Sequence, residues 1–174
     1  MAETMSLSQF LASPDAGSDA VAARVEPRSR RTATGPVLGA LDVGAGPFSG
    51  VRFQVPDGYI AREVRGTKMR TTAGVFDEFA AALQFPYYFG DNRDAFDECL
   101  RDLDEFVGEA PGYVVVIRDS SGLLADQRED LEWFADAMTQ AAEYWAAKGT
   151  VFRVVLQQHP AVLSPVELTM ADPA

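Results

Sequence analysis

The run Tyr-Val-Val-Val-Ile at residues 113–117 constrains the fold of this chain more than any other feature. Successive side chains of a strand point to opposite faces, so an unbroken apolar run places apolar groups on both. Such runs are typical of strands that are buried on both faces, as in a parallel sheet. We therefore expect residues 113–117 to be an inner strand of an α/β fold.

The segments around this strand alternate between strand and helix patterns. Residues 59–65 and 151–156 have the composition of two further strands. Helical spacing of apolar residues predicts helices over 72–83, from Asp91 or Asn92 onward, and over about 127–147. A β-α-α-β-α-β order implies parallel pairing with right-handed crossovers. The expected core is a small three-stranded parallel sheet packed on helices in two layers.

The chain before residue 59 is less regular. Residues 37–43 and 51–55 resemble two short strands, and the glycines and proline of residues 44–50 indicate a loop between them. We expect these segments to form an N-terminal hairpin that extends the main fold.

The expected organisation has three parts: a flexible extension at residues 1–35, a domain at 36–160 and a loose tail at 161–174. Residues 6–12 can form a helical turn or two within the extension. The extension also carries a basic cluster, Arg-Ser-Arg-Arg, at 28–31. We interpret this cluster as part of a flexible arm that contacts acidic neighbours, because it is too short to support a nucleic-acid-binding arm.

The charge balance excludes several classes of partner. The 174 residues include 15 Lys and Arg against 26 Asp and Glu, a formal net charge of −11. Such a charge repels nucleic acids and anionic membranes and attracts cationic partners. The sequence shows no signal-peptide pattern and no run near the ~20 apolar residues that a membrane helix needs. We expect a cytoplasmic protein that binds neither nucleic acid nor membrane directly.

Much of the negative charge lies in the second predicted helix. At about 100° per residue, five of its carboxylates share an arc of roughly 80°: Asp91, Asp94, Glu98, Asp102 and Glu105. Another side of this helix carries apolar residues for a core: Phe96, Cys99, Leu100 and Leu103. Like charges one turn apart destabilise a helix by about 0.2–0.5 kcal/mol per pair. The acidic face therefore suggests a function, although acidic surfaces also serve solubility.

The sequence offers no convincing active site. Cys99 lies on the apolar side of its helix, which favours a core role over a nucleophile. His159 is the only histidine and has no evident catalytic partner, so we expect an ordinary surface residue. Residues 44–50 lack the lysine of a phosphate-binding loop, and no calcium-loop pattern is present. We expect no cofactor, no metal and no enzymatic activity.

A protein-binding surface fits these residues better. Tyr87, Tyr88 and Phe89 come immediately before the acidic helix. At least one of these aromatic residues is expected to anchor the loop to the core. Exposed tyrosines beside carboxylates suit a basic cleft, because they can stack on cationic side chains while the carboxylates pair with arginine and lysine. If the cleft belonged to a ribonuclease, the carboxylates would occupy the places of RNA phosphates.

Residues 85–100, Phe-Pro-Tyr-Tyr-Phe-Gly-Asp-Asn-Arg-Asp-Ala-Phe-Asp-Glu-Cys-Leu, resemble the signature of the barstar family of intracellular ribonuclease inhibitors. That signature runs apolar-Pro-x-Tyr-aromatic-Gly-x-Asn-x-Asp-Ala-apolar-x-Asp-x-Leu. The likeness extends over residues 59–156 and implies a three-stranded parallel sheet and inhibition by plugging a ribonuclease active site.

The resemblance implies that Tyr88, Asn92, Asp94 and Glu98 contact the partner. Two departures concern this segment: Glu98 replaces an aspartate of barstar, and Asp97 replaces a tryptophan. A further family acid in the last helix falls near Tyr144, with Glu143 adjacent. These departures leave the mode of binding intact and put the identity of the target in doubt.

The sequence thus predicts an inhibitor of a basic ribonuclease or related nuclease toxin. The expected partner-binding residues are Tyr88, Gly90, Asp91, Asn92, Asp94, Asp97, Glu98 and Asp102. Two alternatives remain open: a non-inhibitory adaptor of the same fold, and a metal-dependent hydrolase that uses Asp94 and Glu98.

Overall fold

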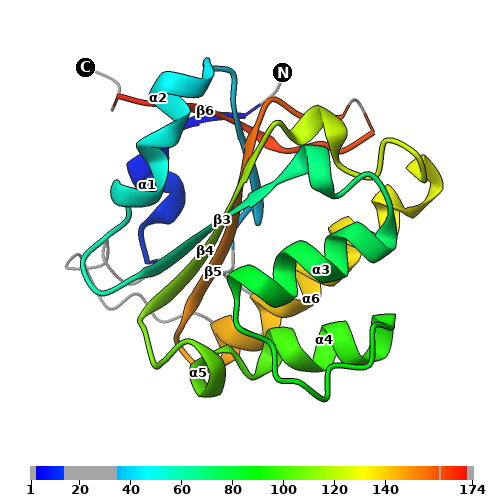
Figure 1. The fold of residues 1–174 in the computed structure, drawn as a ribbon. Helices are drawn as coiled ribbons and strands as arrows, with labels where there is room; N and C mark the ends of the chain where they lie inside the picture. Colours follow the sequence, from blue (N-terminus) through cyan, green and yellow to red (C-terminus); the bar gives the residue numbers. More distant parts are fainter. Residues whose placement is uncertain (1–2, 14–34, 161, 172–174) are drawn as a thin grey trace, which may run out of the picture.

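The apolar run at residues 113–117 lies in an inner strand of a six-stranded, all-parallel sheet. The computed structural model describes residues 3–13, 35–160 and 162–171. The strand order is β1-β6-β2-β5-β4-β3 (Figure 1). The strands are β1 (Thr4–Ser6), β2 (Leu38–Leu41), β3 (Ile60–Arg65), β4 (Gly112–Arg118), β5 (Val151–Gln157) and β6 (Val166–Thr169).

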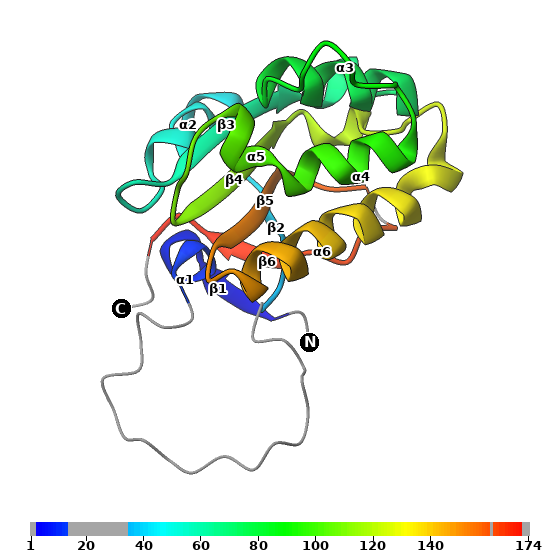
Figure 2. The same ribbon diagram turned by 90° about the horizontal axis from the view of Figure 1, so that it is seen from below.

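Helices cover both faces of this sheet. The α-helices are α1 (Leu7–Leu11), α2 (Ala45–Ser49), α3 (Thr72–Ala82), α4 (Arg93–Arg101), α5 (Leu103–Phe106) and α6 (Leu131–Ala147). Short 3-10 helices are η2 (Val51–Phe53), η3 (Gly66–Lys68), η4 (Ser120–Gly122) and η5 (Arg128–Asp130). Helices α3, α4 and α6 lie on one side of the sheet, and α1 and α2 lie on the other (Figure 2). The fold therefore has three layers, and the prediction of two layers and three strands is corrected.

Strand β4 shows why two cores are needed. Its residues Tyr113, Val115 and Ile117 lie in the core beneath α3, α4 and α6. The alternate residues Val114 and Val116 lie in a second core beneath α1 and α2. This alternation confirms the prediction that the strand is buried on both faces.

The second core depends on segments far from β4 in the sequence. Val114 and Val116 are joined there by Val155 of β5. The remaining buried members come from before residue 59 or after residue 157: Leu7, Phe10, Leu11, Leu41, Phe48, Val51 and Leu168. The flanking segments therefore supply most of the apolar cover on this face of the sheet.

The predicted N-terminal hairpin is wrong. Its first half is β2, which pairs in parallel with β5 on one side and β6 on the other. Its second half is the 3-10 helix η2, and the expected loop between them contains α2. Strand β2 is inserted deep in the sheet at Gly39, where an added Cβ would lie only 2.6 Å from Leu168 Cδ1. A strand paired on both edges has no free edge for a hairpin partner.

The predictions for the two ends of the chain need a similar correction. Strands β1 and β6 pair with each other and lie in the stretches that the sequence analysis assigns to the extension and the tail. The expectation of a loose tail is therefore wrong for Val166–Thr169. Helix α1 confirms the expected helical turns, and Ser6 caps it with a capping box to Gln9. The basic cluster at residues 28–31 lies outside the described residues.

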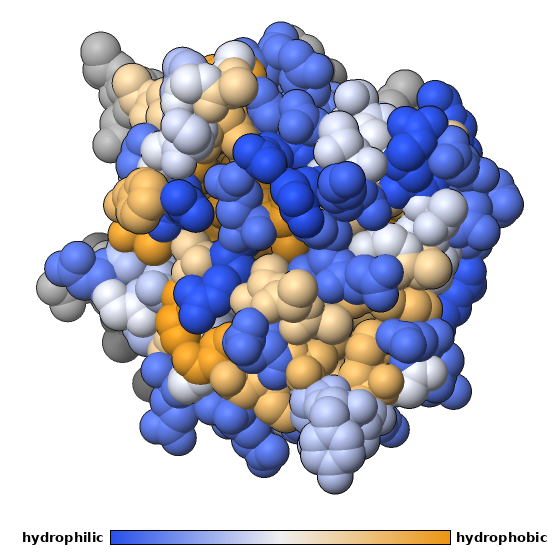
Figure 3. All heavy atoms as spheres, in the orientation of Figure 1, coloured by the Kyte–Doolittle hydropathy of each residue, from blue (hydrophilic) through white to orange (hydrophobic). Residues whose placement is uncertain are grey.

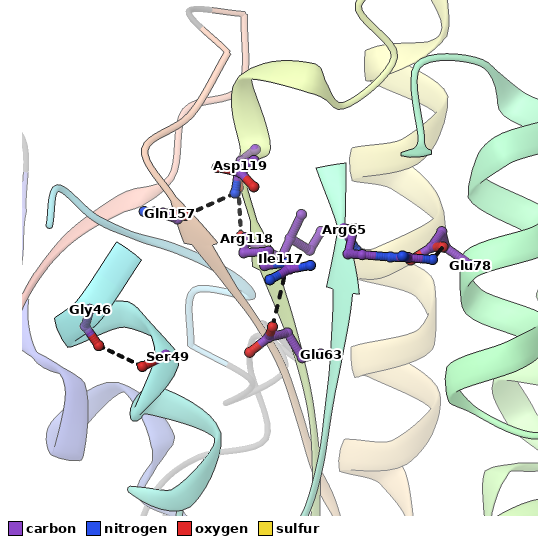
Figure 4. Close-up of polar contacts among 10 residues, drawn as sticks. Gly46, Ser49, Glu63, Arg65, Glu78, Ile117, Arg118, Asp119 and Gln157 are labelled. Atoms are coloured by element: carbon purple, nitrogen blue, oxygen red, sulfur yellow. Dashed lines mark hydrogen bonds and ion pairs between the residues drawn. The ribbon is translucent and has the colours of Figure 1, made fainter. Parts of the chain in front are cut away.

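Polar contacts join the carboxyl ends of β3, β4 and β5 to their surroundings (Figure 4). Arg65, at the end of β3, forms an ion pair of 2.6 Å with Glu78 of α3. Gln157, at the end of β5, accepts a hydrogen bond of 2.9 Å from the backbone N–H of Asp119, which follows β4. These contacts hold α3 and its connections in a fixed position on the sheet.

Candidate binding site

The connection from α3 to α4 divides its aromatic residues into two groups. Phe85 and Phe89 pack against the first core, with their ring centroids 5.2 Å apart. Between them, the backbone N–H of Phe89 donates a hydrogen bond of 2.9 Å to the carbonyl of Pro86. Tyr87 and Tyr88 are the central residues of this turn and are exposed. The expectation that some of these aromatic residues anchor the loop is confirmed for the phenylalanines.

The start of α4 is built from Gly90, Asp91 and Asn92, all of which are exposed. Asn92 is the N-cap: its Oδ1 accepts a hydrogen bond from the backbone N–H of Ala95 at 2.9 Å. Its Nδ2 donates to the carbonyl of Gly90 at 3.1 Å. Asp91 has a φ of 47°, a left-handed conformation that Asp adopts more readily than most residues. Asn92 thus shapes the loop as well as the helix end.

Helix α4 buries Phe96, Cys99 and Leu100 and leaves Asp94 and Glu98 exposed one turn apart. The helix ends at Arg101, and Asp102 is its exposed C-cap with a non-helical ψ of 24°. The predicted arc of five carboxylates on one continuous helix is therefore wrong. Aspartate is a weak helix former, and the chain turns at Asp102 to bury Leu103 at the start of the separate helix α5.

Asp97, between this exposed pair in the helix, lines a shallow cleft of about 330 Å³ between α4 and α6. Its Oδ1 atom is buried and has no hydrogen-bond partner within the described part of the chain. Burial raises the pKa of the Asp97 carboxyl, the nearby Asp94 carboxylate raises it further, and Arg101 opposes the shift. In this cleft, the Asp97 carboxyl group is thus partly desolvated, and its buried Oδ1 atom gains no hydrogen bond from the described residues in return.

The far wall of this cleft holds residues that the sequence analysis did not identify. Arg93 donates a hydrogen bond of 2.7 Å to Asp130 and lies over the ring of Trp133, 4.7 Å from its centroid. The wall from η5 into α6 also carries further polar residues: Glu129, Glu132, Asp136 and Gln140. Positions 129, 133, 136 and 140 recur at spacings of four, three and four, which marks one helix face. That spacing could have indicated the wall from sequence.

A family model described as Barstar (barnase inhibitor) matches residues 59–157 of the 174-residue chain. The matched segment is more than half of the chain and contains the whole site together with β3, β4 and β5. The chain belongs to the barstar family. A comparison with curated proteins found no match.

Family membership accounts for one half of the molecule. The expected three-stranded parallel sheet corresponds to β3, β4 and β5 and to the core beneath α3, α4 and α6. Strands β1, β2 and β6 and helices α1 and α2 lie outside the family match. Barstar proteins are inhibitors and not enzymes, so membership favours a binding role for the surface around α4.

A cation, Lys148, lies near the end of the acidic surface that carries Asp102 and Asp104. Lys148 lies 4.7 Å from the ring centroid of Tyr144 and 5.3 Å from that of Trp145. A hydrogen bond with Tyr144 raises the pKa of Lys148, and the negative charges of Asp104 and Asp102 add to the effect. Where the resemblance leads us to expect an acid in the last helix, this protein has Tyr144, with the exposed Glu143 beside it in the chain and the positive charge of Lys148 nearby. The uncompensated negative charge is therefore concentrated toward the start of α4.

The described residues give little support for a metal site, a reactive cysteine or a catalytic histidine. No group of three or more His, Cys, Asp or Glu side chains in this part of the chain is placed to hold a metal ion. Burial raises the pKa of the Cys99 thiol to about 11, with the charges of Asp102 and Glu98 as further causes. His159 is exposed, and its Nδ1 contacts the carbonyl oxygen of Pro160. Within the residues searched, no helix has the length and apolar character to cross a membrane.

Proposed function

We propose that this protein inhibits a basic ribonuclease or a related nuclease toxin by covering its active site with the loop and helix from Tyr88 to Asp102. The proposal rests on membership of the barstar family and on the state of two carboxylates. Asp94 and Glu98 are exposed side by side on α4, and neither forms an ion pair in the described part of the chain.

Several acidic residues elsewhere in the protein, unlike Asp94 and Glu98, form ion pairs within the described chain. Four of them pair with an arginine within the chain: Glu63, Glu78, Asp126 and Asp130. On α4 the only nearby cation of the first turn, Arg93, is turned toward Asp130 and Trp133. Asp94 and Glu98 are thus left available for cations of a partner, and Tyr88 supplies an exposed aromatic ring beside them.

The remaining proposed contact residues lie around Asp94 and Glu98. Gly90, Asp91 and Asn92 form the loop that joins Tyr88 to the helix, and Asp102 lies at the opposite end of α4. Asp97 lines the cleft behind Glu98. In this proposal Asp94 and Glu98 are the centre of the interface, and the other residues form its border.

Reversing the charge of the two central acids tests the proposal. We expect the Asp94→Lys, Glu98→Lys double variant to lose affinity for a barnase-type ribonuclease by at least about a hundredfold, because interface anchors carry most of the binding energy. Calorimetry and a ribonuclease inhibition assay measure the loss. For the unaltered protein, the association rate should fall as salt rises, because salt screens charges over about 10 Å at 0.1 M and about 3 Å at 1 M.

The matched control is Asp42→Lys with Glu167→Lys. Both acids are exposed and lie on the β2 and β6 side of the sheet, away from α4 (Figure 1). This control changes the net charge by the same amount and should retain most of the affinity. Wild-type affinity in the α4 double variant, or equal losses in both double variants, would contradict a specific interface on α4.

A further inference from the structure

The turn that carries Tyr87 and Tyr88 is held rigidly from both sides. Phe85 lies 6.1 Å from Phe96 between ring centroids, and Phe89 lies 5.8 Å from Phe76. Both partners belong to the buried core beneath α3, α4 and α6. The hydrogen bond from Phe89 N–H to Pro86 closes the turn between these anchors. The backbone that carries its two central side chains is therefore anchored, which limits the backbone entropy that binding would cost.

These two tyrosines contribute nothing to the core. The relative exposure is 101% for Tyr87 and 67% for Tyr88. Their rings contact each other edge to face, with centroids 5.5 Å apart. Pale side chains project from the lower edge of the surface where Figure 1 places the connection from α3 to α4 (Figure 3). A pair of exposed aromatic rings on an anchored turn is typical of a contact surface and not of a packing element.

Other aromatic rings of this protein show what the pair lacks. Three exposed or half-buried rings elsewhere are covered by cations of the chain itself, each 4.7 Å from the ring centroid: Arg52 on Phe53, Arg93 on Trp133 and Lys148 on Tyr144. Tyr87 and Tyr88 carry no such cation within the described residues. The exposed carboxylates of Asp91 and Asp94 follow them in the chain, and the one cation between these, Arg93, is turned toward Asp130 and Trp133.

We propose that Tyr87 and Tyr88 form a seat for an arginine side chain of the protein partner. A guanidinium group stacks on aromatic faces and pairs with carboxylates at the same time, which an ammonium group does less well. This proposal adds Tyr87 to the proposed interface and specifies arginine as the partner side chain that the two tyrosines bind. The role of this arginine site in the complex rests on the proposed function. Its preference for arginine over other side chains rests only on the structure of the turn.

The first test uses a blocked Gly-Arg-Gly peptide as the probe and the full chain as the protein. NMR titration should show ring-proton shifts of Tyr87 and Tyr88 that saturate with the arginine peptide. The neutral citrulline peptide should give shifts at least threefold smaller, and a lysine peptide should fall between them. The ring of Phe53 is the internal control, since Arg52 already covers it. Absent shifts, or equal shifts with citrulline, would overturn the arginine seat.

The second test measures the affinity of a barnase-type ribonuclease for single variants. Tyr87→Ala should weaken binding by about tenfold, mainly through faster dissociation, while Tyr87→Phe keeps the ring and most of the affinity. Phe53→Ala removes another exposed ring, far along the chain from the turn, and should bind as the unaltered protein does. Thermal unfolding of all three variants should be unchanged, because neither Tyr87 nor Phe53 packs in a core.

The two proposals fail separately. If the Asp94→Lys, Glu98→Lys variant keeps full affinity, the proposed function is wrong, and the peptide titration still decides whether the turn binds arginine. If that double variant loses binding but Tyr87→Ala binds as tightly as the unaltered protein, only the seat is wrong.

Discussion

Asp97 occupies a position at which barstar itself has a tryptophan. A tryptophan in barstar is replaced here by a carboxylate whose Oδ1 atom is buried without a hydrogen bond. A buried polar atom without a partner costs free energy in the folded state. Burial of Asp97 Oδ1 in the cleft between α4 and α6 therefore lowers the stability of the unbound protein. A partner that supplies a hydrogen-bond donor there would offset part of this loss.

We expect Asp97→Asn to stabilise the free protein at neutral pH by about 1 kcal/mol or less, since water still screens a partly exposed carboxylate. The folded state raises the pKa of Asp97, so the folded protein holds this proton more tightly than the unfolded chain does. The charged group thus costs stability above its folded pKa, and the cost disappears as the pH falls below the unfolded value of about 3.9.

Urea unfolding at pH 7 and pH 3 measures this difference. The advantage of Asp97→Asn should be present at pH 7 and absent at pH 3. Glu98→Gln, at the next and fully accessible position, is the control and should give a smaller gain at pH 7. An advantage for Asp97→Asn that is the same at both pH values would contradict a titrating carboxylate as its cause.

At the scale of elements, α1 shows how a short helix is held on the sheet. A helix of five residues has little stability of its own. The last carbonyls of α1 accept hydrogen bonds from two distant side chains: Arg153 Nε donates to Phe10 at 3.2 Å, and Tyr59 Oη donates to Leu11 at 2.9 Å. Arg153 is only 5% exposed, and its guanidinium also lies over the ring of Phe10. These contacts join the flanking segment to β5 and to the start of β3.

Arg153→Met should release α1 while leaving α4 in place. We expect a loss of roughly 2–4 kcal/mol of stability, because buried backbone carbonyls lose their donor. Hydrogen exchange should become faster at Ala12, whose N–H bonds to Ser8 within α1, and remain slow at Phe96 in α4.

Tyr59→Phe removes the second donor alone and should cost about 1 kcal/mol. Binding of a ribonuclease should be unchanged in both variants, since α1 and α4 lie on opposite sides of the sheet (Figure 2). Faster exchange in α4 than in α1 would show that the two contacts do not act locally.

At the scale of the molecule, the family domain is one half of a larger three-layer fold. The matched segment at residues 59–157 contains all of the first core except Val37, Ala40 and Leu163, but the second core needs α1, α2, β2 and β6. Val114, Val116 and Val155 would face water if those elements were removed. An exposed apolar sheet face of this kind favours association and loss of fixed packing.

A fragment of residues 59–157 should therefore be markedly less stable than the full chain. We expect it to bind a hydrophobic dye such as ANS and to melt at a lower temperature with less cooperativity. A fragment of residues 35–171, which keeps β2, α2 and β6, should lie between the two. Equal melting curves for the short fragment and the full chain, without dye binding, would mean that the second core is dispensable.

The sequence by itself determined the parts of this protein that depend on neighbours in the chain. The apolar run of β4 and the start of α4 after Asn92 both have local signals, and the structure confirms both of them. The family signature at residues 85–100 likewise identified the matched domain. The roles of the predicted contact residues in binding stay predictions.

Only the tertiary structure decided the features that depend on distant contacts. The partners of β2 are β5 and β6, more than a hundred residues away, so its short apolar run resembled half of a hairpin. The end of α4 at Asp102 follows from the burial of Leu103, and the cleft at Asp97 exists only because α6 packs beside α4. Periodicity shows which side chains need burial, but the segment that buries them is fixed by packing between elements, which no local pattern encodes.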